Sequence, residues 1–191
     1  MDFRKNIITG FAFATLSLNA FAAEMNAGTI HFTGEIIEPS CTIQGTDGSD
    51  STIPLGTYPK SQFTAVGVET TLMPFAITLA NCPLRSDGLP AVQLTFNGPT
   101  TLTKTNTLLD VSKITTTGEI AATGVGVAVS PAGKNDQFIT MDGAEGQVYI
   151  ELATKSSDTI KADFNARYKS FATTVTAGPA DADMTVNILY R

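Results

Sequence analysis

The chain has 191 residues, the length of one domain, and 42% of them are hydrophobic, which is enough for a buried core. It carries 12 Lys and Arg residues against 18 Asp and Glu residues, a formal net charge of −6, with no basic cluster. Nucleic-acid affinity comes largely from Lys and Arg side chains that neutralise phosphates, so this acidic balance argues against a nucleic-acid partner.

The first predicted element is a signal peptide over residues 1–22. Arg4 and Lys5 form a basic start, residues 7–18 are mostly apolar, and Ala20 and Ala22 are the small residues that precede a cleavage site. The apolar run is too short for a stable membrane-spanning helix, although a membrane anchor is the alternative. Cleavage after Ala22 would leave 169 residues with a net charge of −7.

The remainder of the chain is predicted to be all-β. It is rich in Thr, Val, Ile and Ala, and short apolar–polar alternations recur between turn signals, which is typical of a β-sandwich. No stretch has a sustained period of 3.6 residues, so we expect little helix. Pro74 indicates a bulge or a sheet edge. In chain order, the predicted strands cover residues 29–37, 70–79, 92–96, 125–129, 148–152, 168–175 and 184–190.

The chain contains two cysteines, Cys41 and Cys82. An even count in an exported chain predicts one disulfide. A metal site or a reactive thiol is the alternative, but a thiolate metal site usually needs three or four Cys or His ligands, and His31 is the only histidine. We therefore expect neither a metal nor a cofactor.

No catalytic residues can be named from this sequence. A nucleophilic triad would need an activated nucleophile and an orienting acid around His31, and no such spacing occurs. Residues 124–126 lack the third glycine of a nucleotide-binding loop. The acidic pairs at 47 and 50 and at 142 and 145 lack the ligand number of a calcium loop. The sequence predicts a protein that is not an enzyme.

The two ends of the chain carry the functional prediction. Residues 23–33 precede the first cysteine and alternate in a way that would place every second side chain on one face of a strand. The last predicted strand, residues 184–190, lies at the C-terminal end, and its apolar edge risks being left unpaired. Strand addition between chains would resolve both features, because the first segment of one chain would pair with the open edge of another.

These features resemble the major pilins of type 1-like fimbriae of the chaperone–usher class. The resemblance rests on residues 28–37 followed by Cys41, on residues 79–82, and on a C-terminal end in which Tyr190 is penultimate and Gly178 is fourteenth from the end. It runs from the signal peptide to the last residue. It is weakest over residues 83–165, which match only in general β character.

The resemblance implies that residues 34–191 form an incomplete immunoglobulin-like sandwich, completed by a strand donated from a neighbouring subunit. It implies that a periplasmic chaperone first fills the groove, and that the next subunit's residues 23–33 replace it at an outer-membrane usher. The donor residues would be Asn26, Gly28, Ile30 and Phe32. The groove and the chaperone-contacting C-terminal strand would comprise Gly178, Met184, Val186, Ile188, Tyr190 and Arg191.

We therefore expect a structural subunit of a surface fimbria that is exported through the periplasm. Its partners would be identical or related pilins, the chaperone, the usher and, through the assembled fibre, a host surface receptor. A major shaft subunit is favoured over a minor or adaptor subunit. The alternative from another class is a secreted, self-contained β-sandwich that binds a ligand, in which residues 23–33 would pair within their own chain.

Overall fold

The computed structural model describes residues 28–34, 36–112, 114, 119–155 and 157–191. The chain divides into two units, residues 1–33 and 34–191. The predicted signal peptide and Asn26 lie outside the described residues. None of the described residues between 29 and 37 belongs to a strand, so the prediction of a strand there is wrong for the single chain. A strand needs a neighbour to satisfy its backbone groups, and the described residues of this segment belong to neither sheet.

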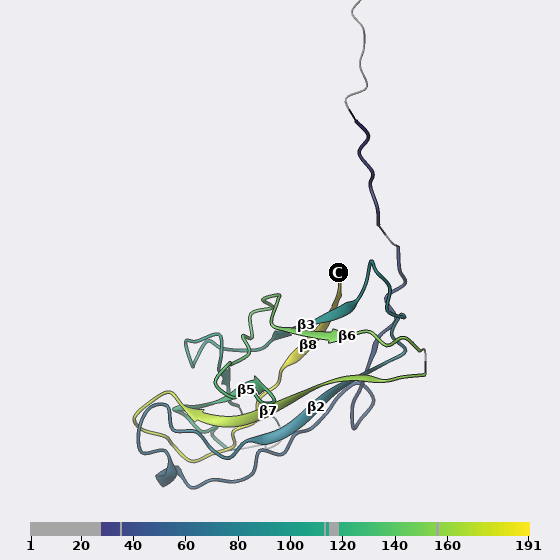
Figure 1. The fold of residues 1–191 in the computed structure, drawn as a ribbon. Coiled ribbons are helices and arrows are strands. Elements are labelled where there is room, and N and C mark those ends of the chain that lie inside the picture. Colours follow the sequence, from purple (N-terminus) through teal and green to yellow (C-terminus); the bar gives the residue numbers. More distant parts are fainter. Residues whose placement is uncertain (1–27, 35, 113, 115–118, 156) are drawn as a thin grey trace, which may run out of the picture. The chain divides into compact units, whose positions relative to one another are not determined.

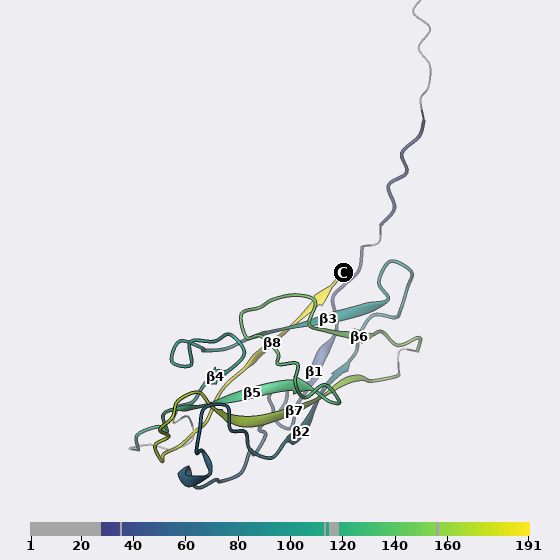
Figure 2. The ribbon, with the colours of Figure 1, turned by 60° about the vertical axis from the view of Figure 1, so that its left-hand side comes forward.

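Residues 34–191 form two antiparallel β-sheets (Figure 1, Figure 2). The five-stranded sheet has the order β1 (Thr42–Gln44), β2 (Met73–Ala80), β7 (Ile160–Ser170), β5 (Val125–Pro131) and β4 (Leu109–Asp110). The three-stranded sheet has the order β6 (Val148–Glu151), β3 (Ala91–Asn97) and β8 (Thr185–Tyr190). In the described residues, one short 3-10 helix, η1 (Lys60–Gln62), is the only helix. The all-β prediction is confirmed.

The core lies between the two sheets and follows the alternation of the strands. Val92, Leu94 and Phe96 are alternate residues of β3, and all three are completely buried. Phe164 on β7 contacts Phe75 on β2 and Phe96 on β3, at ring-centroid distances of 5.4 and 5.8 Å. The contact between Phe164 and Phe96 joins the two sheets, while Phe75 stacks on Phe164 within the five-stranded sheet.

Most predicted strands are present, but two were missed and one was misplaced. The alternations over 70–79, 92–96, 125–129, 148–152 and 184–190 correspond to β2, β3, β5, β6 and β8. The strand predicted over 168–175 overlaps only the end of β7, and β1 and β4 were not predicted. Pro74 on β2 lies opposite Asn165 of β7, while β1 pairs only with residues 78–80, so the predicted sheet edge at Pro74 is confirmed.

The outer face of the five-stranded sheet holds a buried cation. Arg167 on β7 is 1% exposed, its Nε lies 2.6 Å from Oε2 of Glu69, and its Nη1 donates to Ser130 Oγ at 3.0 Å. Lys169 pairs with the other oxygen of the same carboxylate at 2.6 Å. Buried charges are tolerated when they are paired in this way, so Glu69 stabilises this face of the sheet.

Candidate functional site

A groove opens between the edges of the two sheets. β1 is the edge strand of one sheet and β8 is an edge strand of the other, and both can be followed in Figure 2. The cavity between them has a volume of about 460 Å³. Its lining consists of Pro39, Cys41, Ile43 and Ser49 on the β1 side and Val186, Asn187, Ile188 and Tyr190 on the β8 side.

β8 presents an unpaired edge to this groove. It pairs with β3 along its whole length and, in the described part of the chain, has no strand on its other side. The apolar side chains that alternate along it are only half-buried, although they pack against the core. An apolar, unpaired edge is a template for pairing with another chain. The half-buried residues are Met184, Val186, Ile188 and Tyr190.

The β1 side of the groove is held in place by a disulfide. Cys41 and Cys82 form the predicted bond, which joins the residue before β1 to the chain after β2. Beside it, the hydroxyl of Ser40 donates to the carbonyl oxygen of Asn81 at 2.6 Å. β1 has only three residues, so these links supply much of what keeps it on the sheet.

The side chain of Tyr190 connects the two sides of the groove. The backbone N–H of Cys41 donates to the hydroxyl oxygen of Tyr190 at 2.9 Å. This hydrogen bond joins residues that are 149 positions apart in the sequence. The disulfide and the end of β8 therefore meet at one end of the groove.

The predicted donor residues within the described part of the chain are exposed. The side chains of Ile30 and Phe32 are 79% and 93% exposed, and the residues around them form no strand. Gly28 lies in the same extended segment. Exposure of two large apolar side chains to water is unfavourable, so this segment would gain stability from a partner surface.

Three residues predicted for the groove, Gly178, Met184 and Arg191, are not among those that line this cavity. Met184 precedes β8 and packs, half-buried, against the core. Gly178 precedes β8 and lies against the backbone of residues 120–122. The guanidinium of Arg191 forms an ion pair with the carboxylate of Glu145. Conversely, sequence reasoning missed the β1 side of the lining, because only the fold brings β1 opposite β8. The position of Cys41 beside β1 was the available signal.

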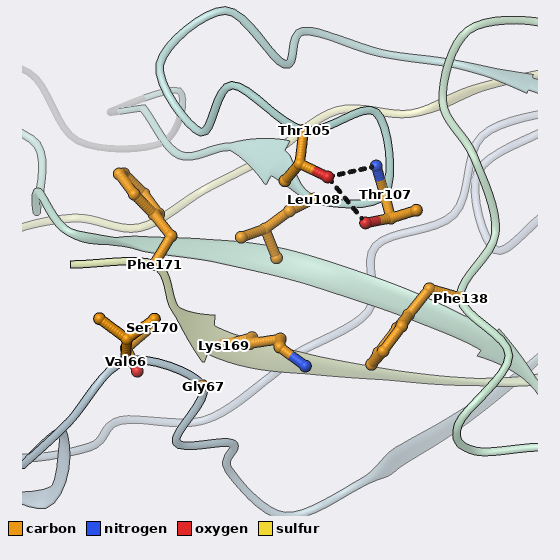
Figure 3. A pocket seen from close by; sticks show the side chains of 9 residues that line it. All are labelled: Val66, Gly67, Thr105, Thr107, Leu108, Phe138, Lys169, Ser170 and Phe171. Atoms are coloured by element: carbon orange, nitrogen blue, oxygen red, sulfur yellow. Dashed lines mark hydrogen bonds between the residues drawn. The ribbon is translucent and has the colours of Figure 1, made fainter.

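A second cavity of about 240 Å³ lies beside the end of β7 (Figure 3). Its polar side chains already have partners. Lys169 pairs with Glu69, the hydroxyls of Thr105 and Thr107 lie 3.1 Å apart, and the hydroxyl of Ser170 donates to a backbone carbonyl oxygen at 2.6 Å. The groove between β1 and β8 is therefore the stronger candidate site.

The described residues contain neither a candidate metal cluster nor a candidate membrane-spanning helix. Across those residues, no three His, Cys, Asp or Glu side chains gather in a way that could hold a metal ion. No helix in the same part of the chain has the length and apolar character needed to cross a membrane.

Known proteins match this chain along nearly its whole length. The family described as Fimbrial protein matches residues 30–191. The type-1 fimbrial protein subunit of Serratia marcescens is 35% identical over 98% of this chain and 99% of that protein. Long polar fimbria protein A of Salmonella typhimurium is 33% identical over 98% of this chain and 97% of that protein. The crystal structure of the P pilus rod subunit PapA is similar with a TM-score of 0.60 and 25% identity, over 80% of this chain and 99% of that one.

The sequence relatives and the structural neighbour thus indicate the same protein family. The family match covers the whole β-sandwich, each relative covers 98% of this chain, and the structural neighbour has a similar fold. The immunoglobulin-like pilin fold expected from the sequence is confirmed. The chain belongs to the fimbrial protein family and is a structural subunit of a fimbria, which places it outside the cell.

Proposed function

We propose that this subunit polymerises by donating residues 23–33 to the groove of a neighbouring copy. The donated segment would lie beside β8 as an additional strand and extend the three-stranded sheet. Alternate residues of a strand face the same way, so Ile30 and Phe32 would enter the groove together with Gly28 and Asn26. His31 would face away from it.

The observation that carries this proposal is the open groove along β8. Its apolar side chains are half-buried and its backbone edge is unpaired in the described residues. Burial of Ile30 and Phe32 would stabilise each junction by roughly 1.5–3 kcal/mol per side chain. Each new backbone hydrogen bond to β8 would add roughly 1 kcal/mol. The groove and the donor segment therefore both gain from strand addition.

The same groove suggests how the subunit is handled before it polymerises. An exposed apolar edge promotes aggregation, so a periplasmic chaperone would cover it with a strand of its own, anchored by the carboxylate of Arg191. An outer-membrane usher would then bring up the next subunit, whose residues 23–33 replace the chaperone strand. Export to the periplasm would rely on residues 1–22 as a signal peptide, and residues 34–191 would be the pilin domain.

We place the subunit in the fimbrial shaft. A shaft subunit needs a groove to accept one neighbour and a donor segment for the next, and this chain carries a candidate for each. Among its structural neighbours is a pilus rod subunit whose whole chain it matches. Attachment to a host surface receptor would then be a property of the assembled fibre.

Matched charge substitutions on the two faces of the donor segment test this proposal. In cells that carry the chaperone and usher, Ile30→Asp and Phe32→Asp should abolish detergent-resistant polymers, because a carboxylate cannot enter an apolar groove without a large desolvation cost. His31→Asp and Thr33→Asp add the same charge at neighbouring positions that face away. These two control variants should polymerise as the wild type does. Gel electrophoresis of unheated fibres measures the outcome.

Two results would count against the donor assignment. Polymers of wild-type resistance from Ile30→Asp and Phe32→Asp would show that these side chains do not enter a groove. An equal loss of polymers in all four variants would show that any added charge in the segment prevents assembly, whichever way the side chain faces. Amounts of subunit in the periplasm, measured in parallel, separate failed assembly from failed export.

A further inference from the structure

Tyr190 links the two edges of the groove by a hydrogen bond. Its hydroxyl oxygen accepts a hydrogen bond from the backbone N–H of Cys41 at 2.9 Å, and both residues line the cavity. In the described part of the chain, this is the one hydrogen bond between the β1 side and β8. The contact is partly buried, so water does not readily replace it.

In the described residues, β1 is joined to its own sheet by few residue pairs, so a link to β8 matters for its position. β1 has one strand neighbour, β2, and only three residue pairs join the two. The disulfide fixes Cys41 to the chain after β2, and hence to the five-stranded sheet. The tyrosine then fixes the end of β8 to the same point. One rigid side chain thereby sets the spacing of the groove at this end.

We propose that Tyr190 is a positioning residue for strand addition, and that its hydroxyl keeps the groove at the width that a donated strand requires. This inference rests on the proposed function. A groove whose spacing is set before binding loses less entropy when a strand enters, and it holds that strand longer. The effect should therefore appear in the rate at which subunits separate, since affinity differences reside mostly in dissociation rates.

The chain offers a matched control for this hydrogen bond. The hydroxyl of Tyr168 donates to the carbonyl oxygen of Ala180 at 3.0 Å and is also partly buried. Burial, with the charge of Asp181, raises the pKa of Tyr168, so this hydroxyl stays protonated at neutral pH. Tyr168 does not line the groove. Tyr168→Phe therefore removes a comparable hydrogen bond and leaves the one between Cys41 and Tyr190 in place.

The test compares fibres of the wild type, Tyr190→Phe and Tyr168→Phe. Dissociation into monomers is followed in detergent at one fixed temperature, and the urea midpoint is measured on the unassembled full-length chains. The urea midpoint should fall by similar amounts in both variants, because each loses one tyrosine hydrogen bond. Only Tyr190→Phe should also speed fibre dissociation, by about fivefold for a bond worth roughly 1 kcal/mol.

Hydrogen exchange at the Cys41 amide keeps the proposal falsifiable if Tyr190→Phe forms no fibres. Faster exchange of this amide in the unassembled Tyr190→Phe chain, and not in Tyr168→Phe, supports the hydrogen bond between Cys41 and Tyr190. Unchanged exchange overturns it, as do fibres of Tyr190→Phe that separate at the wild-type or Tyr168→Phe rate. Failure of strand donation itself would show separately, as wild-type polymers from Ile30→Asp and Phe32→Asp.

Discussion

At the scale of single residues, Gly178 shows why a position can be restricted without lining the groove. A Cβ atom there would lie 2.2 Å from the carbonyl oxygen of Ile120 and 2.7 Å from the nitrogen of Ala122. The two segments are joined beside it, where the N–H of Ala122 donates to the carbonyl oxygen of Pro179 at 2.8 Å. The missing side chain therefore lets the chain before β8 lie directly against its neighbour. This contact helps to define where β8 begins.

Gly178→Ala should therefore lower the free energy of unfolding by about 3 kcal/mol, because backbone atoms cannot move aside as a flexible side chain can. Gly133→Ala is the control: Gly133 has a φ of +78° but open space around it. That variant should lose only the cost of a left-handed conformation, about 1–2 kcal/mol. Urea denaturation of both chains measures the difference. Equal losses would mean that crowding at Gly178 is not the cause.

At the scale of elements, the strands predicted correctly are those with large apolar residues at every second position. β3 and β8 show this clearly, as Val92, Leu94 and Phe96 illustrate. β7 was misplaced because its inner face includes the small residues Ala162 and Ala166, and its outer face is charged. β7 is central because it pairs with β2 and β5, and its buried Arg167 pairs with the distant carboxylate of Glu69, which no local pattern reveals.

The candidate site was predicted unevenly for a related reason. The β8 side of the groove is a regular alternation at the end of the chain, so Val186, Ile188 and Tyr190 were named from the sequence. The β1 side comes from a strand of three residues with no pattern of its own. It faces β8 only because Cys41 is bonded to Cys82 and β2 pairs beside it.

Removal of the disulfide should therefore affect β1 more than the rest of the fold. Cys41→Ser combined with Cys82→Ser leaves no unpaired thiol and should lower the free energy of unfolding by roughly 4 kcal/mol in the chain-entropy description. Amide hydrogen exchange should accelerate first in residues 42–44, while β3 stays protected. The urea midpoint and residue-resolved exchange measure the two effects. An unchanged midpoint, or loss of protection spread evenly over both sheets, would contradict this account.

At the scale of the whole molecule, the chain has a compact unit with an open groove and, in its first unit, apolar side chains exposed to water. Under the proposed strand donation, a polymer would cover both the groove and the exposed side chains at every junction, since each copy would give one segment and receive another. A head-to-tail arrangement of this kind would produce a fibre where it does not close into a ring.

The groove should therefore accept the donor segment supplied as a separate molecule. Residues 34–191 form a compact unit with their own core, and we expect a chain of these residues to be stabilised by a peptide of residues 23–33. At a peptide concentration of 100 times the dissociation constant, the gain is about 2.7 kcal/mol, which corresponds to a rise in melting temperature of about 5–10 °C.

The control is the same peptide with aspartate in place of Ile30 and Phe32, which should leave the melting temperature unchanged. Thermal unfolding, followed over a series of peptide concentrations, measures the shift. A shift with the wild-type peptide alone supports strand donation, since binding to the folded state is the only route by which a ligand can raise stability. No shift, in a chain that melts at the same temperature with and without residues 23–33, would mean that the sandwich is already complete. The self-contained, ligand-binding β-sandwich would then be the better description of this fold.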